Sequence, residues 1–233
     1  MKTILKESGV LLLFAVIFFT LASCIKNAGS SFINSNGPLY ALGNLDTAYL
    51  KKQLTALPWQ PLNEEERNSL IYMREEEKLA RDVYRAMTAK WGANVFSNIL
   101  ASEQTHMDAI LMLLEKYNIP DPVGANGPGV FTNQTLQGIY TKLLAQGGTG
   151  LLPAFKTGAT IEDLDIYDLG NALTKIDNQD IRLVYENLSR GSRNHMRAFY
   201  RNIVKAGGAY TAQYITQAAL DAIINADMET GRN

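Results

Sequence analysis

The feature that most constrains this chain is a set of long helical patterns that carry charged side chains on their apolar faces. Between residues 100 and 117, leucine and isoleucine recur at helical spacing, yet Glu103 and His106 share the stripe of Ile99 and Ile110. Residues three or four positions apart lie on one face of a helix, so both polar side chains are expected to face the interior. An ionised carboxylate costs several kcal/mol to bury unless it is paired or binds a metal. The fold must therefore bring partners to these groups.

Helical periodicity continues through most of the chain after residue 62. Asn63 is a favourable cap residue with three glutamates behind it, and two prolines follow residue 117 and prevent that helix from continuing. No strand pattern of useful length and no internal repeat is evident in the sequence. The expected helices are residues 63–90, 94–117, 133–146, 151–175 and 178–204, with a last helix inside residues 210–229.

Four of these helices are long, and a connection of about thirty residues separates the second from the third of them, whereas an up-down bundle needs only short loops. One long crossover is the connectivity of ferritin-like bundles. We therefore expect an all-α fold, namely a ferritin-like four-helix bundle with one long crossover and an extra C-terminal helix.

Residues 1–23 have the organisation of a secretory signal. Two lysines precede an apolar run over residues 10–21, which is too short and wrongly flanked to span a membrane comfortably. The run ends in Leu-Ala-Ser-Cys, which resembles a bacterial lipobox, and Cys24 is the only cysteine of the chain. We expect a lipoprotein signal peptide at residues 1–23 and a lipid on Cys24, which would anchor the protein to a bacterial membrane on its extracytoplasmic side. A plain signal peptide or an uncleaved anchor is the alternative.

The mature chain is expected to have two parts. Residues 24–61 are rich in Asn, Ser and Gly and are expected to form a flexible tether, of which residues 45–57 could pack near the domain. Residues 62–233 are expected to form the ferritin-like helical domain. Without residues 1–23 the chain keeps 20 basic and 22 acidic residues, a net charge of −2, so it lacks the positive field of a nucleic-acid binder. With Cys24 lipidated no thiol remains, which excludes disulfides and zinc–thiolate sites.

Each of the four long predicted helices carries inward-facing polar residues. Four carboxylates cannot neutralise one another, and two imidazoles can pair with at most two of them. Two divalent cations would satisfy the whole set. Oxygen and imidazole ligands suit iron, manganese or zinc, and the excess of carboxylates favours iron, with manganese possible. The candidate ligands are Glu77, Glu103, His106, Glu162, Asp165 and His195.

The first of these candidates lies in a run of three glutamates. Glu77 is chosen because it shares the stripe of Met73 and Tyr84. A run of like charges is usually a solvated face, so Glu75 and Glu76 are expected at the surface.

The motifs around these residues resemble known proteins. Glu103-Gln-Thr-His106 matches the Glu-x-x-His motif of ferritin-like di-iron carboxylate proteins such as bacterioferritin and rubrerythrin. More closely, "EEEKLARDVY", "SEQTHMDAI", "IEDLDI" and "GSRNHMRAF" together resemble an uncharacterised ferritin-like family, a domain of unknown function, over about residues 65–230. The resemblance implies a ferritin-like fold and a metal site but no established reaction.

The resemblance also implies roles for the candidates. Glu103 or Glu162 would bridge the two metals, and Glu77 and Asp165 would be terminal ligands. His106 and His195 would each hold one metal. Tyr84, seven residues after Glu77, resembles the buried tyrosine that lies near the metal-binding glutamate in the first helix of these families.

The last helix departs from the family pattern. Where better-known families have a second Glu-x-x-His, this chain has Ser192-Arg-Asn-His195. Serine is a poor ligand for iron, so Ser192 is expected only beside the ligands, and Asp165 could restore the number of carboxylates. Whether one or two metals bind is left open by the sequence. A nucleophilic role for Ser192 with His195 would lack an elbow, an oxyanion hole and a third member.

The expected function is oxidation of Fe(II) by oxygen or peroxide, or disposal of peroxide, by a lipid-anchored protein. Rubrerythrins couple this kind of site to a four-cysteine iron, which this chain cannot build, so an external electron donor would be needed. The alternative is a non-catalytic envelope module that binds metal for stability or presents a surface to a partner. A homodimer is possible, and the sequence does not decide it.

Overall fold

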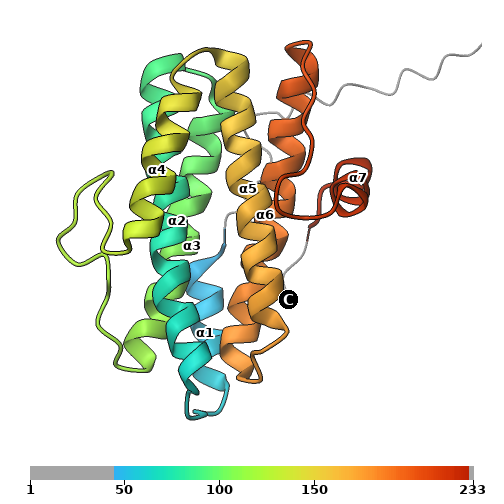
Figure 1. Ribbon diagram of the computed structural model, residues 1–233. Helices are drawn as coiled ribbons and strands as arrows, with labels where there is room; N and C mark the ends of the chain where they lie inside the picture. Colours follow the sequence, from blue (N-terminus) through green and yellow to red (C-terminus); the bar gives the residue numbers. More distant parts are fainter. Residues whose placement is uncertain (1–44, 231–233) are drawn as a thin grey trace, which may run out of the picture. The chain divides into compact units, whose positions relative to one another are not determined.

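The computed structural model describes residues 45–230, which form seven helices and no strand (Figure 1). This part of the chain is therefore all-α, as predicted. The expected signal peptide, the lipidated Cys24 and residues 24–44 of the expected tether lie outside the described residues. The helices are α1 (Thr47–Ala56), α2 (Glu64–Trp91), α3 (Asn94–Lys116), α4 (Gln134–Gly147), α5 (Leu151–Leu173), α6 (Gln179–Lys205) and α7 (Gln217–Asn225).

The five helices predicted between residues 63 and 204 correspond to α2–α6, and α7 lies within the predicted last segment. Local signals explain the boundaries. Asn63 and Glu66 form a reciprocal capping box, in which the Asn63 side chain accepts from the Glu66 N–H at 2.8 Å. At the other end of α2, Gly92 adopts a left-handed conformation with φ 63°, which ends the helix cheaply because glycine has no Cβ.

Helix α1 was not predicted. Residues 47–56 belong to the segment expected to be a tether, of which residues 45–57 could pack near the domain; the structure shows that packing and adds the helix. Asp46 caps the helix by accepting from the Tyr49 N–H at 2.9 Å. Leu50 and Leu54, one turn apart, are buried in a cluster with leucines and isoleucines of α3. Their partners lie some sixty residues away in the sequence.

Two apolar clusters fix the directions of the four long helices. The first includes Val83, Phe96, Phe155 and Phe199, and the second includes Leu70, Ile110, Leu169 and Leu188. Along α2 and α6 the chain passes from the second cluster to the first, and along α3 and α5 it passes from the first to the second. Helices α3 and α5 therefore run in the same direction. Helix α3 is antiparallel to α2, and α5 is antiparallel to α6.

Parallel α3 and α5 require a connection that returns along the length of the helices. Residues 117–150 make this crossover, and they contain α4, which packs against α2 and α5 (Figure 1). Two parallel helices cannot be joined by a short turn, so the length of the crossover follows from the helix directions.

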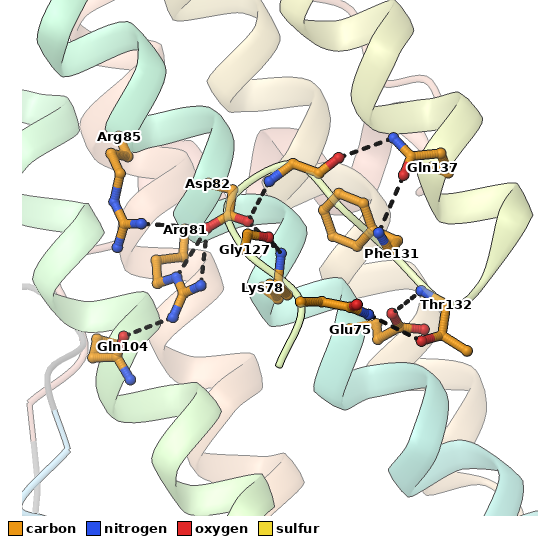
Figure 2. A network of polar contacts seen from close by, with 12 residues as sticks. Glu75, Lys78, Arg81, Asp82, Arg85, Gln104, Gly127, Phe131, Thr132 and Gln137 are labelled. Atoms are coloured by element: carbon orange, nitrogen blue, oxygen red, sulfur yellow. Dashed lines mark hydrogen bonds and ion pairs between the residues drawn. The ribbon is translucent and has the colours of Figure 1, made fainter. Parts of the chain in front are cut away.

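Buried charges of α2 hold the crossover in place (Figure 2). Lys78 and Asp82 are fully buried and their charged atoms lie 2.6 Å apart. The Lys78 ammonium also donates to the Gly127 carbonyl at 2.8 Å, and the Gly129 N–H donates to Asp82 at 2.9 Å. The ammonium lies 4.4 Å from the centroid of the Phe131 ring. A buried ion pair that also satisfies loop backbone groups specifies one position for the loop.

The surface position predicted for Glu75 and Glu76 is wrong. Both side chains are only 2% exposed. Glu75 accepts hydrogen bonds from the backbone N–H groups of Thr132 and Asn133, at 2.5 and 2.8 Å, just before α4 begins (Figure 2). The crossover covers a face of α2 that the local sequence pattern marks as solvated.

Among residues 45–230, no helix combines the length and the apolar character needed to span a membrane.

Candidate metal centre

A layer of charged side chains lies between the two apolar clusters. On each long helix the polar residues stand in sequence between residues of the first cluster and residues of the second. The six predicted ligands are therefore at one level of the helices, and all face the interior. Their exposed fractions are 1% for Glu77, 2% for Glu103, 0% for His106, 1% for Glu162, 6% for Asp165 and 1% for His195.

Glu103 is the centre of this layer. Its Oε2 atom lies 2.9 Å from Nδ1 of His106, and its Oε1 atom lies 3.0 Å from Nδ1 of His195. Each imidazole nitrogen also faces a second carboxylate, which is Glu77 for His106, at 3.2 Å, and Glu162 for His195, at 3.3 Å. One carboxylate from α3 is thus shared by two histidine–glutamate pairs.

Two groups of potential metal ligands result. Glu77, Glu103 and His106 form one, and Glu103, Glu162 and His195 form the other. Within each group the donor atoms lie within 4.8 Å of one another. Glu103 belongs to both groups, so the structure brings five of the six predicted residues into two adjoining candidate sites.

Asp165, the sixth predicted residue, belongs to neither group. Its Oδ2 atom accepts a hydrogen bond from the Ser192 hydroxyl, and its Oδ1 atom is buried without a hydrogen-bond partner among the described residues. Ser192 thus holds the Asp165 carboxylate of the neighbouring helix at the edge of the cluster.

Tyr84 lies on the other side of the cluster. Its hydroxyl donates to Glu162 Oε1 and lies 3.3 Å from the carbonyl of Gly158. Gly158 is needed here, because a Cβ at this position would come within 2.4 Å of the Phe199 ring. The close approach of α5 and α6 at this glycine closes the apolar end of the site.

Ser102 was missed by the sequence analysis. Its fully buried hydroxyl lies 3.0 Å from Nε2 of His195 and 3.5 Å from Nε2 of His106. Both rings thus turn Nδ1 toward carboxylates and Nε2 toward one hydroxyl. A signal was present, because Ser102 lies one turn before His106 on the same buried face as Ile99.

The ionisable groups of the cluster are buried, so their pKa values depend on burial and on the charges of their neighbours. Burial alone would lower the pKa of His195, but the carboxylates of Glu162 and Glu103 raise it to about 10. The pKa of His106 is likewise well above its usual value, because Glu77 and Glu103 outweigh the effect of burial. For Glu103, burial acts to raise the pKa, yet the two histidines hold it well below its usual range.

The pKa values of the outer carboxylates, which are Glu77, Glu162 and Asp165, are raised, whereas that of Glu103 is lowered. Burial and the neighbouring Asp165 carboxylate raise the pKa of Glu77 well above its usual value. Burial and the Glu162 carboxylate raise the pKa of Asp165 to about 7. Burial also raises the pKa of Glu162 against the opposing effect of His195. The protein alone therefore does not satisfy all the negative charges that it gathers here.

This donor set fits a pair of divalent cations. Glu77 Oε1 and Asp165 Oδ1 are buried and accept no hydrogen bond from the described residues. Orphaned buried oxygens are rare in folded proteins, and each needs a partner. Two divalent cations would balance four carboxylates with both imidazoles neutral, and carboxylate and imidazole ligands are those of non-haem iron and manganese sites.

The fold and the site define an all-helical protein with a buried cluster of carboxylates and histidines at mid-height of four long helices. The chain belongs to the family of the uncharacterized protein domain DUF2202, whose pattern matches residues 66–227. It is 54% identical over 180 residues to the uncharacterized protein MJ0754 of Methanocaldococcus jannaschii, which is 77% of this chain and 97% of that protein.

A solved structure supports the fold. The crystal structure of hypothetical protein MJ0754 from Methanococcus jannaschii matches with a TM-score of 0.73 at 55% identity, over 75% of this chain and 99% of that chain. The names of these relatives state no ligand and no activity.

Proposed function

We propose that this chain is a ferritin-like di-metal protein that oxidises Fe(II) or reduces oxygen or peroxide. The observation that carries the proposal is the position of Glu103, whose two oxygens face two histidine–glutamate pairs. A carboxylate placed between two such groups is suited to bridging two metal ions. Iron is the preferred occupant and manganese is the alternative, because neither site offers sulfur and both are rich in carboxylate oxygen.

The helix directions support the ferritin-like relation. Such bundles are joined by one long crossover, and their di-metal sites take carboxylates from all four helices and histidines from two of them. In this chain α3 and α5 run parallel, the crossover contains α4, and the two histidines come from α3 and α6. The departure is on α6, where Ser192 replaces a glutamate and Asp165 of α5 supplies the fourth carboxylate.

Each metal would have its own residues. Glu77 and His106 would hold one ion, Glu162 and His195 would hold the other, and Glu103 would be shared. Asp165 would serve as an additional terminal carboxylate. Bound iron would supply the one-electron redox chemistry that no protein side chain of this site provides.

The protein's own groups prepare the site. Tyr84 donates to Glu162 and fixes the orientation of that carboxylate. The apolar clusters on both sides exclude bulk water, which strengthens every charge interaction between them. The chain has a single cysteine and cannot build a four-cysteine iron site, so continued turnover would use an external electron donor.

The cellular location is part of the proposal. The lipobox-like end of the signal segment would place a lipid on Cys24 and anchor the protein to a bacterial membrane outside the cytoplasm. Cys24→Ala should release the protein from the membrane fraction or block its processing. Normal cleavage with continued membrane retention would contradict the lipid anchor.

The test of the proposed chemistry combines metal content with turnover. The purified full-length chain should hold about two iron or manganese ions by elemental analysis, as bridged carboxylate sites do. Added Fe(II) should be oxidised in air faster than in buffer, with oxygen uptake measured at an electrode, and Glu103→Gln should lose both properties. Metal binding without turnover would favour the non-catalytic module, and absence of binding would refute the proposal.

A further inference from the structure

A buried carboxylate outside the candidate ligand groups lacks a compensating charge. Glu76 of α2 is 2% exposed, and the one side chain within hydrogen-bonding reach of its carboxyl group is another acid, Asp168. The charges that face it are those of Asp165, Asp168 and Glu77, and together with burial they raise its pKa well above the usual value. A buried acid whose neighbouring charges are all acidic costs the fold stability, and no basic side chain offsets that cost here.

Asp168 connects Glu76 to the surface. It lies beside Glu76, accepts a hydrogen bond from the Tyr72 hydroxyl at 3.3 Å, and is only about half buried. Asp168 and Tyr72 line a groove between α2 and α5 with a volume of about 360 Å³. Glu65 and Lys175 stand at the same groove with largely exposed side chains.

Asp165 connects Glu76 to the candidate metal centre. Asp165 lies one helical turn before Asp168 on α5, its charge acts on both Glu76 and Glu77, and the charge of Glu162 acts on it in turn. Asp165 Oδ1 is buried without a hydrogen-bond partner among the described residues. Carboxylates therefore continue from the groove through the interior to the ligands of both candidate sites.

We infer that Glu76, together with Asp165 and Asp168, forms an access path by which divalent cations pass from the groove between α2 and α5 to the candidate metal centre. The path rests on the proposed function, since it leads to that centre. Hard divalent cations prefer oxygen ligands, and successive carboxylates offer them partial replacement of their water shell. Glu76 belongs to neither of the two ligand groups, and none of the charges that act on it is basic, so no cationic side chain would repel a metal ion there.

The experiment measures cation uptake without redox chemistry. Metal-free full-length chain is mixed with Co(II) in a stopped-flow instrument, and the visible absorption of bound Co(II) is followed to its end point. Glu76→Gln and Asp168→Asn should each slow uptake about tenfold, because a single-sign path raises the local cation concentration by about that factor or more. The end-point absorption and the number of Co(II) bound should stay unchanged. Both changes are isosteric, and Asp168 is half exposed, so the fold is retained.

Glu65→Gln is the matched control. It removes one negative charge from the same groove, but outside the path, and should leave the uptake rate unchanged. Equal rates for Glu76→Gln and wild type would overturn the access path, and so would a lower end point at an unchanged rate, which would make Glu76 a ligand. Slower Fe(II) oxidation with normal Co(II) uptake would assign Glu76 to proton movement instead and would also overturn it. A wild-type chain that binds no Co(II) would refute the di-metal proposal itself.

Discussion

The imidazole rings of His106 and His195 stack with 5.5 Å between their centroids, although they come from α3 and α6. Both Nδ1 atoms contact the Glu103 carboxylate, one at each oxygen, and both Nε2 atoms face the Ser102 hydroxyl. The two candidate metal sites are therefore not independent. Any change at Glu103 or Ser102 should affect both.

Glu103→Gln should reduce metal binding at both positions, because the amide offers one weak oxygen ligand where the carboxylate offers two. The number of Co(II) ions bound at equilibrium should fall from about two to one or fewer, as expected when a shared ligand is lost. Glu115→Gln makes the same change on an exposed turn of α3 and should have no effect. Unchanged binding by Glu103→Gln would contradict the bridging role.

Ser102→Ala should weaken metal binding without changing the number of ions bound. With Nδ1 committed to metal, each Nε2–H donates, and the two lone pairs of the Ser102 hydroxyl can accept both. Loss of groups that orient ligating histidines typically costs about 10–100-fold in affinity. Competition with a chelator of known affinity would measure the change. Ser97→Ala, at an exposed position of the same helix, is the control and should bind as wild type does.

The sequence was informative where the necessary signal was local. Glu103 and His106 are three residues apart on an apolar stripe, and that spacing alone places both on the buried face of α3. His195 and Glu162 could be found in the same way, because each interrupts the apolar face of its own helix. The helix ends were predictable for the same reason, since caps such as Asn63 act within one turn.

Prediction from the sequence failed for residues whose partners lie far away along the chain. Glu75 and Glu76 have the pattern of a solvated face, and only the crossover and α5 bury them. The role of Ser102 depends on His195 from α6. In each case the deciding partner lies far along the chain, so no local pattern of hydrophobicity or charge could reveal it.

Metal loading near pH 7 should release protons. The pKa of His195 is raised to about 10 and that of His106 lies well above its usual value, so both rings are protonated in the metal-free chain. Metal needs the neutral imidazole, and loading should therefore release about two protons per chain from the histidines, with more from the outer carboxylates. A pH indicator in weak buffer, titrated with Co(II), would count them. Proton-free loading would exclude the histidines as ligands.

Ser192→Ala should shift metal binding to higher pH. The hydrogen bond from the Ser192 hydroxyl lowers the pKa of Asp165, against burial and Glu162, which raise it to about 7. Without this bond the carboxylate ionises only at higher pH, so the midpoint of Co(II) binding against pH should rise, while the stability changes by about 1 kcal/mol. An unchanged midpoint would show that Asp165 does not take part in binding.

The metal-free chain should become more stable as the pH falls from 7 to about 5. Asp165 has a pKa of 3.8 in the absence of its folded environment and about 7 within it, so the folded state binds this proton more tightly and gains stability as the pH falls between these values. The histidines act in the same direction, because their raised pKa values favour the folded state below about pH 6.5.

The gain should be about 1–3 kcal/mol, which is the free energy of shifting one carboxyl pKa by one to two units. It should end in stronger acid, where the lowered pKa of Glu103 means that its contribution to stability is lost. Bound metal should remove the effect, since it stabilises the folded chain and compensates the carboxylates. Thermal melts at pH 7 and pH 5.5, with Mn(II) or with a chelator, measure this directly. The chelated protein should have the lower Tm at pH 7 and recover part of the loss at pH 5.5, whereas a Tm that falls with pH and ignores Mn(II) would mean that the cluster is satisfied without metal.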